Sequence, residues 1–270
     1  MRKPELIASD IDGTLLDPLE RITERTTRVL DKVRTEGTPF VLVSGRPPRW
    51  IPRVADPADL NGYAVCANGA VLYDIADDRV LSVHGLEPVL LRDVVDALDG
   101  ELGDVSFAVE RVGERAHDHE LAEFVTETGY RNPWGDEASQ TQTRAEMLGR
   151  TAVKLLASNG RMTSDEMAVI ANELLGDSVD ITFSTGHGLI EISAHGVTKA
   201  TGLSEVASRM DVAARDCIAF GDMPNDVPML SWAGHGVAMA NAHPAVLDVA
   251  DEVTGANAED GVAMVLERWF

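Results

Sequence analysis

Two short apolar segments and the stretch between them constrain the fold most strongly. Leu6–Ser9 and Phe40–Val43 have the length and composition of β-strands, and the residues between them place their apolar side chains on one helical face. Thr23 can cap this helix and Gly37 can end it. Because both strands are apolar along nearly their whole length, we expect them to be covered on both faces. A strand, a helix and a second strand of this kind predict an α/β fold with a parallel sheet.

The same pattern returns near the end of the chain, after a segment of different character. A helix is expected from Lys199 to Met210, followed by a buried strand and by a final amphipathic helix. Residues 84–191 instead contain several separate strand-like segments and one helix, expected at Ser164–Leu175. We therefore expect a parallel-sheet core formed by residues 1–83 and 192–270, with helices on both faces. An α+β unit is inserted between its two parts.

The charge of the chain narrows the range of partners. The 23 Lys and Arg residues against 45 Asp and Glu residues give a net charge of −22. Proteins that bind nucleic acid need clustered cations to displace counterions from phosphates, and the sequence has no such cluster. The sequence has no apolar stretch of about 18 residues, the length that suggests a membrane span. We therefore expect a cytoplasmic protein that has neither nucleic acid nor a membrane as its partner.

Asp10 and Asp12 follow directly on the first predicted strand. In extended backbone, residues two positions apart point to the same side, so we expect the two carboxylates on one side and Ile11 on the other. Adjacent carboxylates repel each other unless a cation lies near them, which favours a metal site. The alternative is an acidic turn in which Gly13 only supplies the bend.

Ser44, Gly45 and Arg46 follow the second predicted strand in the same way. A hydroxyl group and exposed backbone N–H groups at a strand end can bind phosphate oxygens. A polar turn that closes the strand explains the same residues. Ligands bind at the carboxyl ends of the strands in an open α/β sheet, so we expect this segment to lie near Asp10 and Asp12.

Two further segments bring charged side chains from the C-terminal half. Lys199 is expected in the first turn of its helix, where the helix dipole disfavours a cation. An anionic group is therefore expected beside it, although a solvated lysine is the alternative. Asp222 and Asp226 follow the strand Cys217–Phe220, and a Mg²⁺ site needs one or two such carboxylates together with water and phosphate oxygens.

These segments together resemble the phosphatases of the haloacid dehalogenase superfamily. Those enzymes carry an Asp-x-Asp-Gly-Thr segment, a Ser or Thr after a second strand, a Lys at a helix start, and a Gly-Asp-x-x-Asn-Asp segment. The corresponding segments here are Asp10–Thr14, Ser44, Lys199 and Gly221–Asp226. The 155 residues from Ser44 to Lys199 place the insertion where the Cof-type subgroup has its large α/β cap, type IIB. The resemblance covers the chain except for about residues 91–150, and it implies a Rossmann-like core.

The resemblance implies an enzyme that hydrolyses a small phosphorylated metabolite, similar to a sugar phosphate, through an aspartyl-phosphate intermediate with Mg²⁺ as cofactor. Asp10 is then the nucleophile, Asp12 the general acid and base, and Lys199 a catalytic residue that balances charge. A further similar segment is Cys66–Ala70. The implied metal ligands are Asp10, Asp12 through its carbonyl group, Asp222 and Asp226. The implied phosphate- and substrate-binding residues are Ser44, Gly45, Arg46, Asn68, Gly69, Lys199 and Asn225.

Two other functions stay open on the sequence alone. A phosphomutase of the same cap type shares the two catalytic Asp residues, and a non-catalytic phospholigand-binding protein can use the same scaffold. Intact Asp10, Asp12, Lys199 and Asp222 argue against the binding protein, because it needs no general acid. The protein is expected to be a monomer or a homodimer.

Substrate specificity is expected in the inserted unit, because the four segments that act on phosphorus lie outside it. The polar segment His117–Gln142 is the candidate, with Arg131, Asn132 and Trp134 as the side chains to test. Glu191 lies in an alternating strand, and its position fits a site residue or a solvent-facing residue equally well.

Overall fold

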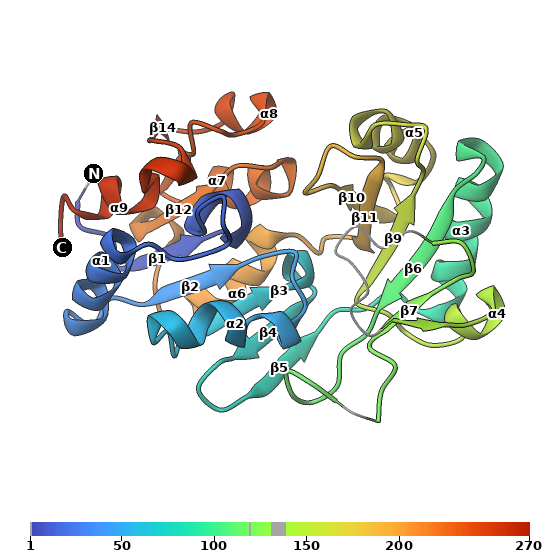
Figure 1. Cartoon of the computed structure of the whole chain (residues 1–270), viewed down its shortest axis with the longest axis horizontal. Helices are drawn as coiled ribbons and strands as arrows, with labels where there is room; N and C mark the ends of the chain where they lie inside the picture. The colour runs from blue at the N-terminus through green and yellow to red at the C-terminus, as the bar shows by residue number, and fades with distance from the viewer. Residues whose placement is uncertain (1, 119, 131–138) are drawn as a thin grey trace.

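The computed structural model, which describes residues 2–118, 120–130 and 139–270, contains two β-sheets that lie side by side (Figure 1). Within these residues, the large sheet has eight strands in the order β14-β13-β12-β1-β2-β3-β4-β5. The small sheet has six strands in the order β10-β11-β9-β6-β7-β8. We call the part of the chain that carries the small sheet, residues 86–194, the small unit, and the remainder the large unit.

The large sheet is parallel except at one edge. Strands β14 to β3 pair in parallel, whereas β4 and β5 form an antiparallel hairpin beside β3. The central strand β1 pairs with strands from both ends of the chain, because Ile7 lies opposite Phe40 on one side and Ile218 on the other. The parallel-sheet core expected from the sequence is confirmed. The strands are β1 (Leu6–Ser9), β2 (Phe40–Val43), β3 (Tyr63–Cys66), β4 (Val71–Asp74), β5 (Arg79–Val83), β12 (Cys217–Gly221), β13 (His235–Ala238) and β14 (Glu252–Val253).

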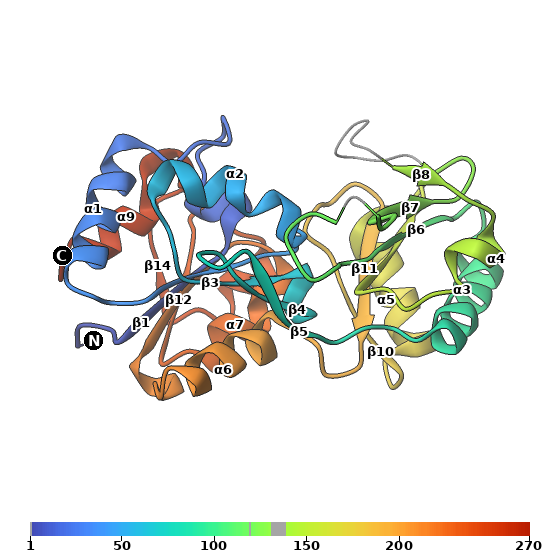
Figure 2. The ribbon, with the colours of Figure 1, turned by 90° about the horizontal axis from the view of Figure 1, so that it is seen from below.

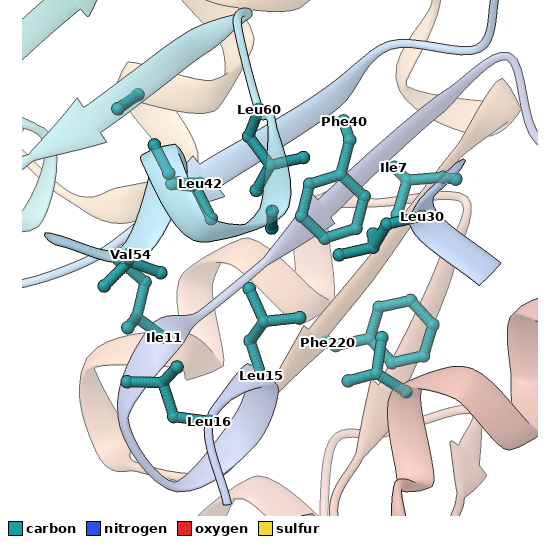
Figure 3. Close-up of a cluster of buried hydrophobic side chains, with 14 of the residues drawn as sticks. Ile7, Ile11, Leu15, Leu16, Leu30, Phe40, Leu42, Val54, Leu60 and Phe220 are labelled. Carbon is teal, nitrogen blue, oxygen red and sulfur yellow. The ribbon is translucent and has the colours of Figure 1, made fainter. Parts of the chain in front are cut away.

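Helices cover both faces of the large sheet (Figure 2). Side chains alternate along a strand, so Ile7 faces one apolar cluster and Leu6 the other. The cluster around Ile7 also contains Leu30, Phe40 and Phe220 (Figure 3). On that face lie α1 (Glu24–Thr35), α2 (Pro52–Ala55) and α9 (Gly261–Leu266). On the opposite face lie α6 (Lys199–Arg209), α7 (Val227–Trp232) and α8 (Pro244–Leu247).

The expected limits of α1 are confirmed. The hydroxyl oxygen of Thr23 accepts a hydrogen bond from the backbone N–H of Thr26 at 3.2 Å, which caps the helix. Gly37 lies just past the helix with φ +72°, a left-handed conformation that glycine adopts without strain. None of the helices formed by the described residues is long and apolar enough to cross a membrane.

The small unit packs two helices on one face of its sheet. Phe107 and Leu155 of the sheet belong to the apolar cluster that includes residues of α3 and α5. The opposite face carries Ala108, Leu156 and Leu189, together with charged side chains described below. Helix α5 has the expected bounds, whereas α3 was not expected. The elements are α3 (Pro88–Leu102), β6 (Ser106–Glu110), β7 (Phe124–Thr126), β8 (Gln140–Thr141), α4 (Arg144–Met147), β9 (Lys154–Ser158), α5 (Ser164–Leu175), β10 (Val179–Thr182) and β11 (Leu189–Ala194).

The chain passes between the units twice, near residues 84–85 and 195–198. Strand β11 of the small sheet continues to Ala194, so the expected boundary between residues 191 and 192 falls inside a strand. The first crossing is tied to α6, because Glu205 of that helix accepts a hydrogen bond from Ser82 at 3.1 Å and lies 3.6 Å from His84. The second crossing leads directly into the first turn of the same helix.

Candidate active site

Asp10 lies at the carboxyl end of β1, in the middle of the large sheet. Its backbone N–H donates to the carbonyl oxygen of Phe220 at 3.0 Å. The chain then turns at Gly13, which has φ +75°, and a Cβ atom at this position would lie 2.3 Å from Asp222 Oδ2. Only glycine fits here. Asp10 and Asp12 line the same pocket, which has a volume of about 460 Å³, so the two carboxylates share one side of the segment as expected.

Three buried carboxylates meet behind this pocket. One oxygen each from Asp10, Asp222 and Asp226 can be chosen so that all three lie within 4.8 Å of one another. The fully buried Nζ of Lys199 donates to Asp10 Oδ1 and to Asp226 Oδ1, both at 2.6 Å. The anionic partner expected beside the first turn of α6 is therefore present, and the alternative of a solvated lysine is wrong.

The charges in this cluster do not balance. Burial raises the pKa of Asp10 well above its usual value, and the neighbouring carboxylates add to the effect while Lys199 opposes it. Burial and the charge of Asp226 raise the pKa of Asp222 to about 7. Burial alone would lower the pKa of Lys199, but Asp10 and Asp226 hold it above the usual value. A group of three carboxylates around one ammonium suits a further cation.

Asp226 and Asp222 differ in their surroundings. Both oxygens of Asp226 are used, one by Lys199 and the other by the backbone N–H groups of Asp222 and Met223 at 2.9 and 3.0 Å. Asp222 Oδ1 accepts a hydrogen bond from the Thr14 hydroxyl at 3.0 Å. Asp226 therefore fixes the loop and the lysine, while Asp222 is held in place beside Asp10. This oxygen-only donor set is the kind that Mg²⁺ prefers.

The segment after β2 reaches Asp12. Arg46 Nε and Nη2 donate to the two carboxylate oxygens of Asp12 at 2.8 and 2.5 Å, although the Asp12 side chain is 54% exposed. Ser44 is buried at the end of β2, and its hydroxyl oxygen accepts a hydrogen bond from the backbone N–H of Arg46 at 3.1 Å. The structure thus brings Ser44, Gly45 and Arg46 to the pocket beside Asp10 and Asp12. Here the Arg46 guanidinium contacts the proposed general acid.

The small unit supplies part of the pocket wall, through residues that the sequence did not assign to the site. Glu191 is only 1% exposed, so its interpretation as a solvent-facing residue is wrong. Lys154, at the start of β9, is also buried, and its Nζ donates to Gly45 O at 2.6 Å and to Glu191. A lone Lys before an otherwise apolar strand is the sequence signal that could have indicated it. The lining residues are Asp10, Asp12, Glu20, Ser44, Gly45, Arg46, Trp50, Arg53, Lys154, Ser184, Thr185, Glu191, Met223 and Asn225.

Two asparagines connect Glu191 to the large unit. Asn68 Nδ2 donates to Glu191 Oε2 at 2.9 Å, and Asn225 Nδ2 donates to Asn68 Oδ1 at 3.1 Å. Burial would raise the pKa of Glu191, but Lys154 and the hydrogen bonds from Lys154, Ser184 and Asn68 hold it below the usual value. Asn225 Oδ1 is buried and has no hydrogen-bond partner within the described part of the chain. Asn68 and Asn225, both expected in the site, thus lie together.

Gly69 has a packing role in this structure. Its φ is +104°, and a Cβ atom at this position would lie 2.0 Å from the carbonyl oxygen of Thr198, the N-cap residue of α6. Gly69 and Lys199 are not among the pocket-lining residues of the described chain. Lys199 instead contacts Asp10 from behind the pocket. Arg131, Asn132 and Trp134 lie outside the described residues, so their part in specificity stays a prediction.

Comparisons with known proteins give a family and relatives that agree with the chemistry of this site. Residues 7–266 match the family of haloacid dehalogenase-like hydrolases. The chain is 29% identical over 270 residues to a 5-amino-6-(5-phospho-D-ribitylamino)uracil phosphatase of Bacillus subtilis, covering 99% of this chain and 98% of that protein. It is 25% identical to a pyridoxal phosphate phosphatase of Escherichia coli, with 97% of each chain covered.

Solved structures show the same fold over nearly the whole chain. A haloacid dehalogenase-like hydrolase from Bacteroides thetaiotaomicron superimposes with a TM-score of 0.75 at 26% identity, covering 99% of this chain and 100% of that one. A subclass IIB sugar phosphatase of the superfamily superimposes with a TM-score of 0.81 at 20% identity, covering 98% of each chain. The family expected from the sequence is confirmed.

Proposed function

We propose that this chain, which belongs to the haloacid dehalogenase-like hydrolases, is a Mg²⁺-dependent phosphatase that hydrolyses a small phosphorylated metabolite. The expected enzyme class, a phosphoric monoester hydrolase, is confirmed by the hydrolase family together with the curated relatives that are named as phosphatases. The observation that carries the mechanism is the position of Asp10: it lines the pocket beside Asp12 and is paired with the buried Lys199. A carboxylate at a strand end, held by a cation from behind, is a suitable nucleophile for phosphorus.

The reaction proceeds in two steps on Asp10. In the first, an Asp10 oxygen bonds to phosphorus, the bond to the leaving oxygen breaks, and Asp12 gives that oxygen a proton. In the second, Asp12 takes a proton from water, which attacks the aspartyl-phosphate and releases inorganic phosphate. Because Arg46 holds both Asp12 oxygens, the guanidinium must release at least one of them when substrate binds. Arg46 and Ser44 then bind phosphate oxygens.

The carboxylate cluster is the place for the metal. Asp10, Asp222 and the Asp12 carbonyl group would hold Mg²⁺, with Asp226 orienting the loop and Lys199. When bound, the ion neutralises phosphate oxygens and makes phosphorus a better electrophile. The raised pKa values of Asp10 and Asp222 express the same excess of negative charge. The cluster therefore fits the ion in both its donor atoms and its charge.

The leaving group is expected to be small and polar, as in a sugar phosphate. The pocket of about 460 Å³ is lined by Ser184 and Thr185, which carry hydroxyl groups, by the amide residue Asn225 and by Glu20. Such groups bind hydroxyl-bearing molecules. The small unit supplies several of these residues, which supports its assignment as a cap over the site. The two curated relatives described above are named for other phosphorylated metabolites.

A phosphate-release assay tests the proposal. We expect the purified protein to release phosphate from p-nitrophenyl phosphate when Mg²⁺ is present, and the Asp10→Asn variant to release none. A phosphomutase would act only with a bisphosphate activator, and a phospholigand-binding protein would bind phosphate without turnover. Either result would overturn the phosphatase. A screen of phosphorylated metabolites then identifies the substrate.

A further inference from the structure

One face of the small sheet carries a buried ion pair that points at the large unit. Glu191 lies opposite Leu156 in the register of β11 and β9, and Lys154 lies two residues before Leu156, so both side chains are on the same face. The Lys154 side chain is 6% exposed and the Glu191 side chain 1%. Helices α3 and α5 cover the other face. The pair therefore lies between the two units.

Both members of this pair contact loops of the large unit. Lys154 Nζ donates to the carbonyl oxygen of Gly45 at 2.6 Å, and Glu191 Oε2 accepts from Asn68 Nδ2 at 2.9 Å. The two loops are themselves connected, because the backbone N–H of Asn68 donates to the carbonyl oxygen of Ser44 at 3.0 Å. The ion pair thus reaches the loops that follow β2 and β3 from the small unit.

The contact at Gly45 has a consequence for Ser44. The carbonyl group of Gly45 and the N–H group of Arg46 belong to one planar peptide group, so a bond that fixes the carbonyl also fixes the N–H. That N–H donates to the Ser44 hydroxyl oxygen at 3.1 Å. One acceptor site of the Ser44 hydroxyl is occupied in this way, so its hydrogen points elsewhere and can be donated to a phosphate oxygen of a substrate in the pocket.

We propose that the Lys154–Glu191 pair is a positioning element of the phosphatase site, which aligns Ser44 and Asn68 when the small unit docks on the large unit. The inference rests on the proposed function, because Ser44 is a group that would bind phosphate and Asn68 holds Asn225 of the pocket lining. Lys154 acts through the Gly45–Arg46 peptide, and Glu191 acts through Asn68 and holds Lys154. Neither residue needs to touch the substrate for this effect.

The cost of this arrangement supports a role beyond stability. Two charges removed from water lose hydration, and apolar residues of the same volume often stabilise a protein as well or better.

Gly45 allows the close approach of these groups, because a Cβ atom there would lie 3.1 Å from Asn68 Oδ1 and 3.3 Å from Glu191 Oε2. A larger residue would press against the groups that make the contacts.

The variants Lys154→Met and Glu191→Gln test the proposal, with Glu110→Gln as the matched control. Glu110 is also a buried carboxyl on the small sheet, and it contacts Arg49 of the large unit, but neither Gly45 nor Asn68. We expect Lys154→Met to lower kcat/KM for p-nitrophenyl phosphate about tenfold or more, as the loss of one charged hydrogen bond in a site does. Inorganic phosphate should inhibit this variant correspondingly less. Glu191→Gln should show a smaller change of the same kind, and Glu110→Gln little change.

Three further measurements decide the outcome. Lys154→Arg keeps the cation and its donors, so it should restore much of the activity; no recovery would mean that the cation does not act on the loop. If the variants lost activity only with a large polar substrate and not with p-nitrophenyl phosphate, the pair would bind the leaving group and the proposal would be wrong. If Lys154→Met fails to fold, the double variant Lys154→Met, Glu191→Met takes its place in the same assays, because it leaves no unpaired buried charge.

The proposed function is tested separately. Calorimetric titration with inorganic phosphate in the presence of Mg²⁺ measures the alignment without turnover. If the wild type hydrolyses p-nitrophenyl phosphate, Asp10→Asn does not, and Lys154→Met equals the wild type in both assays, only the positioning role is overturned. If Asp10→Asn remains active, the proposed function itself is overturned.

Discussion

Lys199 and Asp10 are 189 positions apart in the sequence, yet the lysine Nζ lies 2.6 Å from the Asp10 carboxylate, with neither side chain more than 7% exposed. The same ammonium group donates to Asp226. Removing the charge of Asp10 therefore leaves a complete ion pair, whereas removing Lys199 leaves two carboxylates without their cation. Substitution of Lys199 should therefore destabilise the protein much more than substitution of Asp10.

Asp10→Asn should abolish turnover and leave the melting temperature within a few degrees of the wild type. The amide has nearly the same volume but cannot attack phosphorus, and it removes one of three mutually repelling charges. Phosphate release and a thermal melt of the same sample measure both effects. Hydrolysis that persisted in this variant would exclude Asp10 as the nucleophile.

Lys199→Met should abolish turnover and also destabilise the fold. Breaking a buried ion pair from one side leaves an uncompensated charge and costs about 3–5 kcal/mol. Urea unfolding of the variant, beside Asp10→Asn as the reference, gives the difference in the free energy of unfolding. Equal stability of the two variants would show that Lys199 does not neutralise the carboxylates.

EDTA should stop hydrolysis, Mg²⁺ should restore it, and excess Ca²⁺ should inhibit, because Ca²⁺ prefers more ligands at longer distances. Thr14→Val removes the hydrogen bond to Asp222 Oδ1 and should raise the Mg²⁺ concentration for half-maximal activity about 10- to 100-fold, as is usual when support for a ligand is lost. Thr126→Val, a buried threonine in the small sheet, is the control. An unchanged Mg²⁺ requirement in Thr14→Val would contradict the site.

Gly69→Ala should destabilise the protein by more than 2 kcal/mol, roughly the level of the larger single-residue effects. The added methyl group would lie 2.0 Å from Thr198 O, and φ of +104° strains any other residue. Gly100→Ala in α3 is the control, since no atom of the described residues lies within 4 Å of the added atom there. This control should be neutral or stabilising by up to about 1 kcal/mol. Similar melting temperatures for both variants would disprove the close packing at Gly69.

Glu110 should make stability depend on pH. Burial raises its pKa from 4.5 to about 7, although Arg49 opposes the shift. The folded state therefore binds a proton that the unfolded state has lost, and this contribution to stability is complete below pH 4.5 and disappears as the pH rises through 7. The wild type should lose up to about 3 kcal/mol relative to Glu110→Gln between pH 5 and pH 8. A stability difference that stayed constant over this range, measured by urea unfolding, would contradict the shift.

The parts of the fold with local signals could be predicted from the sequence. The strand Phe40–Val43 and the helix Ser164–Leu175 have the expected bounds, because apolar period and caps are properties of neighbouring residues. Helix α3 also has such a signal, with Leu91, Val94 and Leu98 at helical spacing, so its absence from the expected elements was a missed pattern. The hairpin of β4 and β5 was missed as well, although the four residues between the two strands are too few for a parallel connection.

The site residues also fall into a group that the sequence indicates and a group that it does not. The residues that bear the expected chemistry lie at strand ends and form recognisable segments, so the sequence indicates them. Lys154 and Glu191 were not identified as a pair, because their contact depends on the register of β9 and β11 and on how the two sheets dock. Neither can be deduced from the neighbouring residues. For Glu191, it is burial at 1% exposure that decides between the two interpretations.

The pairing of β1 with β12 also determines the order in which the two units can fold during synthesis. Ile7 must find Ile218, whereas every strand of the small sheet lies within residues 86–194. During synthesis the small sheet can form as soon as its own segment has left the ribosome, while the apolar edge of β1 stays open until most of the chain is complete. An open apolar edge of this kind favours aggregation. We therefore expect newly made chains to depend on chaperones most strongly during the synthesis of the small unit.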